Sequence, residues 1–120
     1  MNEYAEAAKA LNRLNWVGME PDEVYDEIAS VGADTVRIIK PFARHELILS
    51  QMEHARKMGA VAVGIDIDHV VGKDGRYDIV DGMPLGPVML DDLKKYVAST
   101  PLPFVAKGVL SVQDALKCLE

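Results

Sequence analysis

Helix-like and strand-like patterns alternate along the chain, and this alternation restricts the possible folds more than any single motif does. Helical patterns occupy four segments, at 3–13, 21–31, 44–58 and 90–97. Aliphatic and β-branched runs typical of strands alternate with them, at 14–19, 35–39, 60–67 and 102–107. Because the chain passes through a helix between successive strands, we expect the strands to be parallel and the fold to be α/β.

A short internal repeat supports this interpretation. The sequence Ser-Val-Gly-Ala-Asp-Thr-Val at 30–36 echoes Lys-Met-Gly-Ala-Val-Ala-Val at 57–63, and each joins a helix end to a strand start. We therefore predict four β/α units without a linker. The Gly- and Pro-rich stretch 70–87 is expected to be a connection or a lid, and Ser111 with Asp114 predicts the start of a final helix.

The overall composition narrows the classes of partner. The chain is 49% hydrophobic and 27% charged, with a formal net charge of −6, which is typical of a folded globular protein. No basic patch stands out among the more numerous acids, so neither nucleic acid nor an anionic membrane surface is expected as a partner. No apolar run approaches the roughly 20 residues needed to span a bilayer.

A few isolated residues carry separate expectations. Cys118 is the only cysteine, and residues 1–6 have no signal-peptide pattern, which favours a reducing cytoplasm. Cys118 is expected to be a half-buried helix residue. Trp16 is expected in the core or as a rim contact, and His45 and His54 on a helix surface.

The strand at 60–67 carries the most informative alternation. Small and acidic residues occupy one face, ending in Asp66 and Asp68, whereas Val63, Ile65 and their neighbours occupy the other. Bulky aliphatic residues suit the face that packs against helices, and small residues suit a crowded barrel interior. The two carboxylates are therefore predicted on the interior face, where they need a partner or a function.

Other strand ends carry charge as well. Lys40 follows the strand at 35–39, and Lys107 ends the strand at 102–107. Since chemistry in parallel α/β proteins collects at the carboxyl ends of strands, we expect these lysines near Asp66 and Asp68. His69 is either part of this site or a solvated loop residue, and a metal site would need further ligands, none of which is evident.

One segment resembles a known family. Leu-Pro-Phe-Val-Ala-Lys-Gly-Val at 102–109, followed by Ser-Val-Gln-Asp-Ala at 111–115, resembles the flavin-contacting strand and next helix of the FMN-dependent 2-hydroxy-acid oxidases and dehydrogenases. The resemblance implies a (β/α)8 TIM barrel with FMN as cofactor. It places Lys107 at the N1/C2-carbonyl edge of the flavin, where a fixed ammonium stabilises the charge of the reduced ring.

The resemblance extends toward the amino terminus. The strand at 58–68 looks like the family strand ending in Thr-Val-Asp, which assigns to Asp68 the carboxylate that supports the catalytic histidine. Asp66 replaces a threonine that contacts the flavin. Ile38 stands at a glutamine position beside the cofactor, and Lys40 at the position of a tyrosine that faces the substrate. These departures bear on substrate preference and on the flavin contacts.

The implied activity is the transfer of hydride from a 2-hydroxy acid to flavin N5, while a histidine takes the hydroxyl proton. That histidine and the phosphate-binding strands of the family follow the segment that resembles 102–120. Since a full barrel takes about 250 residues, residues 1–120 are expected to form a single partial domain, about half a barrel, that is inactive alone.

Two alternatives to this activity remain open. In the first, the chain is a non-catalytic half-barrel whose open edges drive homo-oligomerisation or pairing with a complementing half. In the second, it is another FMN- or phosphate-binding barrel, such as a relative of isopentenyl-diphosphate isomerase or inosinate dehydrogenase. Those enzymes would need different residues at the strand ends.

Overall fold

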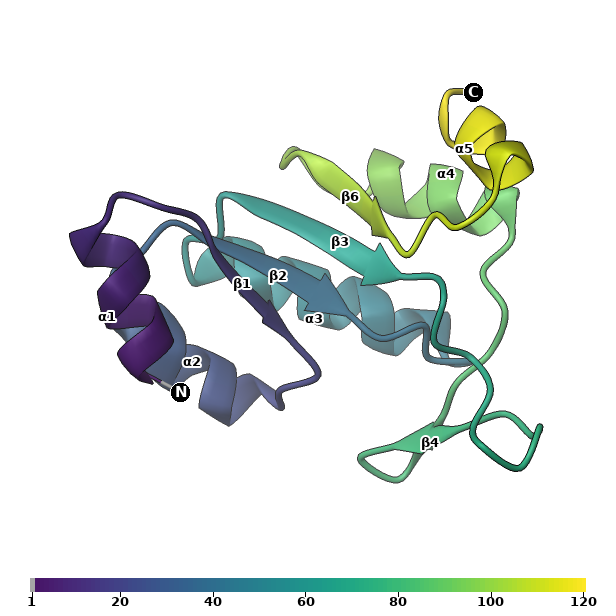
Figure 1. The fold of residues 1–120 in the computed structure, drawn as a ribbon, viewed down its shortest axis with the longest axis horizontal. Coiled ribbons are helices and arrows are strands. Elements are labelled where there is room, and N and C mark those ends of the chain that lie inside the picture. Colours follow the sequence, from purple (N-terminus) through teal and green to yellow (C-terminus); the bar gives the residue numbers. More distant parts are fainter. Residues whose placement is uncertain (1) are drawn as a thin grey trace.

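A four-stranded parallel sheet forms the centre of the computed structural model, which describes residues 2–120. Its strands run in the order β1 (Asn15–Gly18), β2 (Thr35–Ile39), β3 (Ala62–Asp66) and β6 (Phe104–Lys107). All four point the same way, so their carboxyl ends share one side of the molecule (Figure 1). The predicted parallel α/β arrangement is confirmed. Within the described residues the sheet is open, with β1 and β6 as its edges.

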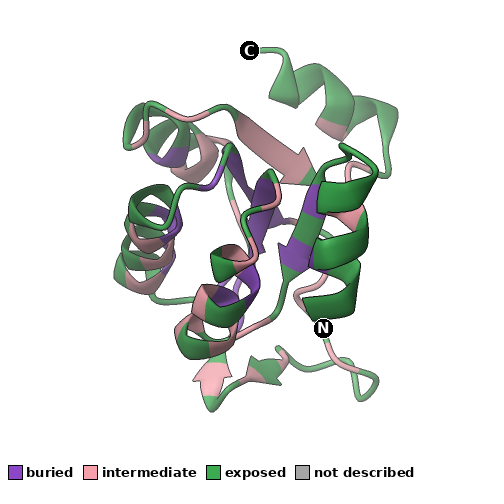
Figure 2. Ribbon diagram, turned by 90° about the vertical axis from the view of Figure 1, so that its left-hand side faces the viewer, coloured by how far each residue is buried: buried purple, intermediate pink, exposed green. Residues whose placement is uncertain are grey.

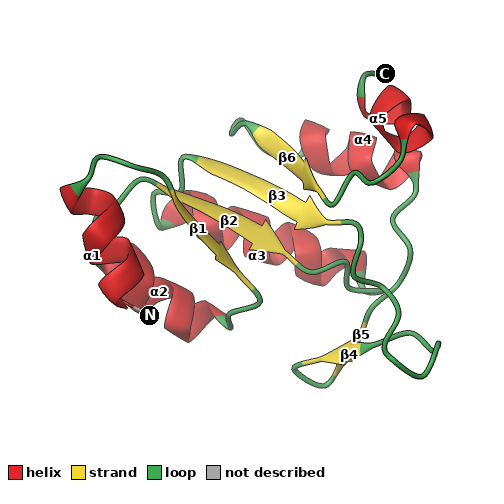
Figure 3. Ribbon diagram, viewed as in Figure 1, coloured by secondary structure: helices red, strands yellow, loops and turns green. Residues whose placement is uncertain are grey.

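Helices separate the strands, as Figure 3 shows. They are α1 (Asn2–Ala10), α2 (Asp22–Ser30), α3 (His45–Lys57), α4 (Leu90–Ala98) and α5 (Val112–Cys118). The longest of them, α3, packs against both β2 and β3, while α1 packs against α2 and β1. A small antiparallel hairpin, β4 (Ile79–Val80) with β5 (Met83–Pro84), lies beyond the carboxyl ends of the strands (Figure 1).

The two faces of the sheet bury different side chains. Val63 and Ile65 belong to the large cluster that the helices cover, whereas Ile38 and Ala62 form a smaller cluster on the opposite, interior face. The predicted alternation along β3 is therefore confirmed within the strand. Ala60 is an exception, because it precedes the strand and packs into the helix-covered cluster. Figure 2 shows buried residues concentrated in the central strands.

Gly64 reveals how crowded the interior face is. A Cβ atom at this position would overlap the carbonyl oxygen and Cβ of Val105 on β6, and would approach Cδ1 of Ile38 to 2.9 Å. Any larger residue would push β3 and β6 apart or displace Ile38. The absence of a side chain at Gly64 is thus required by the close approach of the neighbouring strand.

Several predicted details need correction. The first helix ends at Ala10 rather than at residue 13, and β3 is shorter than 60–67. Cys118 is exposed rather than half-buried. Of the two places expected for Trp16, the core is wrong, because the residue is 55% exposed and stands on β1 at the edge of the sheet. Cys118 and Trp16 are exposed because the terminus and the sheet edge lack neighbours that would bury them.

Candidate functional site

The predicted site residues come from three adjacent strands. Asp66 ends β3 and lies directly opposite Lys107, which ends β6. Lys40 is the first residue after β2, whose Ile39 is paired with Ile65 of β3. Parallel register therefore brings these charged residues to one level at the carboxyl edge of the sheet, where the sequence predicted them.

Asp66 is the centre of this cluster. Its Oδ2 accepts a hydrogen bond from Lys40 Nζ at 2.7 Å, and its Oδ1 accepts one from Lys107 Nζ at 3.0 Å. The side chains of Asp66 and Lys40 are each only 7% exposed, whereas that of Lys107 is 48% exposed. One carboxylate therefore bridges a buried ammonium and an ammonium that still reaches solvent.

The protonation of Asp66 follows from these contacts. Burial by itself raises the pKa of Asp66. The hydrogen bonds that Lys40 and Lys107 donate to Asp66 outweigh burial and hold that pKa well below its ordinary value. Conversely, the hydrogen bond to Asp66 raises the pKa of Lys107. Asp66 and Lys107 are therefore both charged at neutral pH.

Asp68 lies next to the cluster, in close contact with the chain after β6. Its Oδ1 is 3.6 Å from Lys107 Nζ, and its side chain is one-third exposed. Gly108, at φ +88°, lies against it so closely that a Cβ there would overlap the Asp68 carboxylate. The Lys-Gly pair therefore needs its glycine both for the backbone conformation and for this contact.

His69 connects the cluster to the following loop. Its Nδ1 lies 3.0 Å from Lys40 Nζ, and its Nε2 lies 2.7 Å from Oδ2 of Asp78. The hydrogen bond with His69, followed by one from the Ile79 amide, lowers the pKa of Asp78. Sequence reasoning missed Asp78, because a single aspartate in a Gly-rich loop carries no signal of which strand end it will reach.

A hollow of about 390 Å³ opens on the interior face beside these residues. Its polar wall is formed by Lys40, Asp66 and Lys107, and the rest of the lining is mostly apolar: Trp16, Val17, Gly18, Met19 and Ile38. Asp68 is not part of this lining. Such a mostly apolar surface with a few converging charges is typical of a small-molecule site.

The donor set agrees with the anionic edge of a flavin ring, because Lys107 presents an exposed ammonium beside an apolar wall that includes Ile38 and Trp16. The positive charge of Lys107 is partly compensated, however. Asp66, Asp68 and Asp78 supply three carboxylates against the two ammonium groups of Lys40 and Lys107. Lys107 therefore presents one positive charge to the hollow, within a cluster in which carboxylates outnumber ammonium groups.

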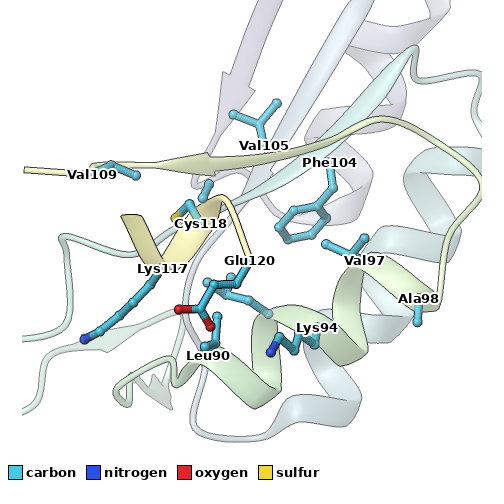
Figure 4. A pocket seen from close by; sticks show the side chains of 12 residues that line it. Leu90, Lys94, Val97, Ala98, Phe104, Val105, Val109, Lys117, Cys118 and Glu120 are labelled. Atoms are coloured by element: carbon cyan, nitrogen blue, oxygen red, sulfur yellow. The ribbon is translucent and has the colours of Figure 1, made fainter. Parts of the chain in front are cut away.

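A larger, more apolar hollow of about 610 Å³ lies elsewhere, between α4, β6 and α5 (Figure 4). In Figure 4, Phe104 of β6 and Val97 of α4 lie side by side on its wall. It contains none of the strand-end charges. We regard it as an incompletely covered sheet edge rather than a site of chemistry.

The remaining histidines lie away from the cluster. His45 contacts the Tyr96 hydroxyl, and His54 Nε2 lies 2.5 Å from Oδ1 of Asp26. Among residues 2–120, no group of three or more His, Cys, Asp or Glu side chains is arranged to hold a metal ion. None of the described helices is long and apolar enough to cross a membrane.

Comparisons with known proteins add the following. No protein-family model matches the chain, and no curated protein matches it. Among solved structures, mandelate oxidase bound to 3,3-difluoro-2-hydroxy-3-phenylpropionic acid matches with a TM-score of 0.80 and 21% identity, over 97% of this chain and 38% of that one. A mandelate oxidase variant with (S)-mandelic acid gives the same four values. Another variant, with a monooxide FMN adduct, gives a TM-score of 0.79 and 20% identity, over 98% and 37%.

The chain thus spans less than two-fifths of the length of these proteins. At such identity the likeness concerns the fold. The structural neighbours are of the kind that the sequence resembled, an FMN-dependent 2-hydroxy-acid oxidase. The chain has the fold of the corresponding β/α part of mandelate oxidase.

Proposed function

We propose that this chain provides the flavin-edge part of an FMN-dependent oxidoreductase that acts on a small 2-hydroxy acid. The observation that carries the proposal is Lys107. Its half-exposed ammonium lines the hollow and is held at the end of β6 by Asp66. The likeness of the fold to mandelate oxidase supports the same assignment.

FMN, when bound, would supply the hydride acceptor. Lys107 would hold positive charge at the edge of the ring, where a preorganised ammonium stabilises developing negative charge. Ile38 would contribute apolar surface, and Asp66 would fix the position of Lys107. Because Asp66 also neutralises part of that charge, we expect Lys107 to act more weakly here than beside a neutral threonine.

Lys40 is proposed to bind the substrate carboxylate. An ammonium has three N–H donors, and the structure uses two of them, toward Asp66 and His69. The third remains for a ligand, and Lys40 does line the hollow. Its burial restricts the position of that donor, so binding would select small acids that reach the strand edge.

Asp68 is proposed to support the histidine that accepts the hydroxyl proton. Within residues 2–120, His69 is the histidine at this cluster, and both its ring nitrogens already have partners. It therefore does not supply that base. We infer that the chain alone binds FMN weakly and turns over little. We also propose a reducing, cytoplasmic location, because the thiol of Cys118 is exposed and unpaired.

Flavin titration of the purified chain tests this proposal. Replacing Lys107 with Met should weaken FMN binding about tenfold, the scale of one charge-assisted hydrogen bond. Lys117→Met is the matched control, because Lys117 is an exposed lysine on α5 outside the charged cluster. Equal affinities for the two variants would contradict the role of Lys107. Isolation of a yellow chain with stoichiometric FMN that lactate or glycolate reduces would contradict its inactivity alone.

A second candidate function is self-association as a half-barrel. Both edges of the sheet, β1 and β6, are open, and an apolar hollow adjoins β6 (Figure 4). Edge strands expose unpaired backbone groups that favour pairing with another strand. Two such four-stranded sheets would together provide the eight strands of a closed barrel. Sedimentation that shows a stable, folded monomer at all concentrations would rule this candidate out.

A further inference from the structure

The loop that follows β3 returns to the end of β2. The Leu85 amide donates to the Asp78 carbonyl at 2.8 Å, and the Asp78 amide donates to the Val70 carbonyl at 3.0 Å. Ala43, three residues beyond Lys40, then donates to the Pro84 carbonyl at 2.9 Å. Asp78 is therefore at the centre of the closed loop, and the loop ends beside Lys40.

The side chain of Asp78 is fully engaged as well. Its Oδ1 accepts the Ile79 amide at 2.9 Å, and its Oδ2 is 2.7 Å from His69 Nε2. Loop residues around it are exposed, including Tyr77 at 61% and Ile79 at 64%. Leu85, Val80 and Met83 attach the far side of the loop to the main core, whereas at Asp78 itself the polar contacts set the position.

These contacts determine the proton position on His69. A lysine ammonium only donates hydrogen bonds, so Nδ1, at 3.0 Å from Lys40 Nζ, must be the acceptor. The ring proton of the neutral imidazole then lies on Nε2 and is donated to Asp78. A proton on Nδ1 would instead point at the ammonium.

We propose that His69 is a positioning residue for the strand-end site. As the neutral Nε2–H tautomer it accepts from Lys40 and donates to Asp78, so that one ring holds both the buried ammonium and the adjoining loop. It acts through Lys40 and does not touch the reacting atoms. Its importance for turnover rests on the proposed function, whereas the tautomer and the loop attachment do not.

Nitrogen-15 NMR of the histidines in the full chain tests the tautomer directly. His69 should show the neutral Nε2–H pattern in a single state at neutral pH. His54 is the internal comparison, because it pairs with Asp26 at 2.5 Å but no lysine donates to it among the hydrogen bonds of the described residues. An Nδ1–H pattern for His69, or the averaged signal of a free imidazole, would overturn the proposal.

Two substitutions then separate the two hydrogen bonds of His69. In His69→Gln the amide nitrogen can replace Nε2, and in His69→Asn the amide oxygen can replace Nδ1. His69→Gln should preserve amide protection at Asp78 and Leu85, whereas His69→Ala should speed exchange there about tenfold, as expected for the loss of one hydrogen bond. His69→Asn should preserve the slowly exchanging ammonium signal of Lys40, which His69→Ala should lose.

The control is His54→Ala, which should change neither signal. If His69→Ala also leaves both unchanged, the proposal fails. None of these measurements requires flavin, so this inference and the assignment of Lys107 can fail separately. If His69 shows the predicted tautomer but the chain does not bind FMN, the positioning role stands and the proposed oxidoreductase function is contradicted.

Discussion

The centre and the β6 edge belong to one parallel sheet but differ sharply in how far their residues are buried. Every residue of β2 and β3 is buried. In β6 the residues are only partly buried or exposed, and α5 buries none of its residues. The site joins these regions, because Asp66 belongs to the buried centre and Lys107 to the edge. The proposed flavin-contacting cation is thus the least constrained member of its own cluster.

Among the residues of the site, the largest expected effect comes from the central carboxylate. Asp66→Asn should destabilise the chain by about 3 kcal/mol, because it leaves the ammonium of Lys40 buried without a counter-charge. Asp68→Asn, one-third exposed, should cost less than about 1 kcal/mol. Urea unfolding measures both. Equal losses in the free energy of unfolding would contradict the expected difference between the buried Asp66 and the partly exposed Asp68.

A glycine in the centre should be less replaceable than one at the edge. Gly64→Ala should cost about 1–3 kcal/mol, since the added methyl group collides with Val105 of the adjacent strand. Gly18→Ala on β1 is the control, because its Cβ would meet only Ile38, at an ordinary 3.5 Å. Thermal unfolding compares them, and a Gly64→Ala chain as stable as Gly18→Ala would contradict the close packing of β3 and β6.

The lowered pKa of Asp66 predicts that the free energy of unfolding decreases at acidic pH. Its folded pKa is depressed, so its contribution is present above the unfolded value of about 3.9 and is lost as pH falls toward the folded value. Stability measured by urea from pH 7 downward should therefore decline below about pH 4. The Asp66→Asn chain should decline less steeply over this range, and parallel curves would remove Asp66 as the cause.

The raised pKa of Lys107 predicts a smaller effect of opposite sense at the edge. Its contribution is complete below the unfolded value of about 10.4 and is lost as pH rises through the folded value. Because Lys107 is half exposed, solvent screens most of this contribution. The buried Tyr25 and Tyr96, whose pKa values are raised by burial, also titrate at alkaline pH, so the prediction concerns the difference between the two chains. Stability of the unaltered chain should fall only slightly more steeply than that of Lys107→Met. A large difference would show that the edge is more rigid than its exposure indicates.

The smallest effect is expected on α5. Leu116 is 60% exposed, so Leu116→Ala should change stability by no more than about 0.5 kcal/mol. Ile48→Ala on α3, where the side chain is 1% exposed, should cost about 2–5 kcal/mol. A large effect of Leu116→Ala, or one that depends on protein concentration, would indicate that another chain covers this edge in solution.

Sequence periodicity was sufficient for the centre of the fold. The alternation of small and aliphatic residues along β3 predicts which side chains lie on each face of the sheet. Parallel register then places Asp66 opposite Lys107. The edges were harder to predict, because exposure of Trp16 and Cys118 depends on neighbours that a local pattern does not describe. Asp78 was missed for a related reason: its partner His69 is nine residues away, across a loop without periodicity.

The contact between Gly108 and Asp68 makes the two positions mutually dependent in any attempt to redesign this site. A side chain at 108 is opposed by the positive φ and by overlap with the carboxylate at 68. Randomising position 108 alone should therefore return glycine, while randomising both positions should admit Asn or Asp at 108 together with a small residue at 68. The two residues, forty positions apart in sequence, would then be selected as a pair.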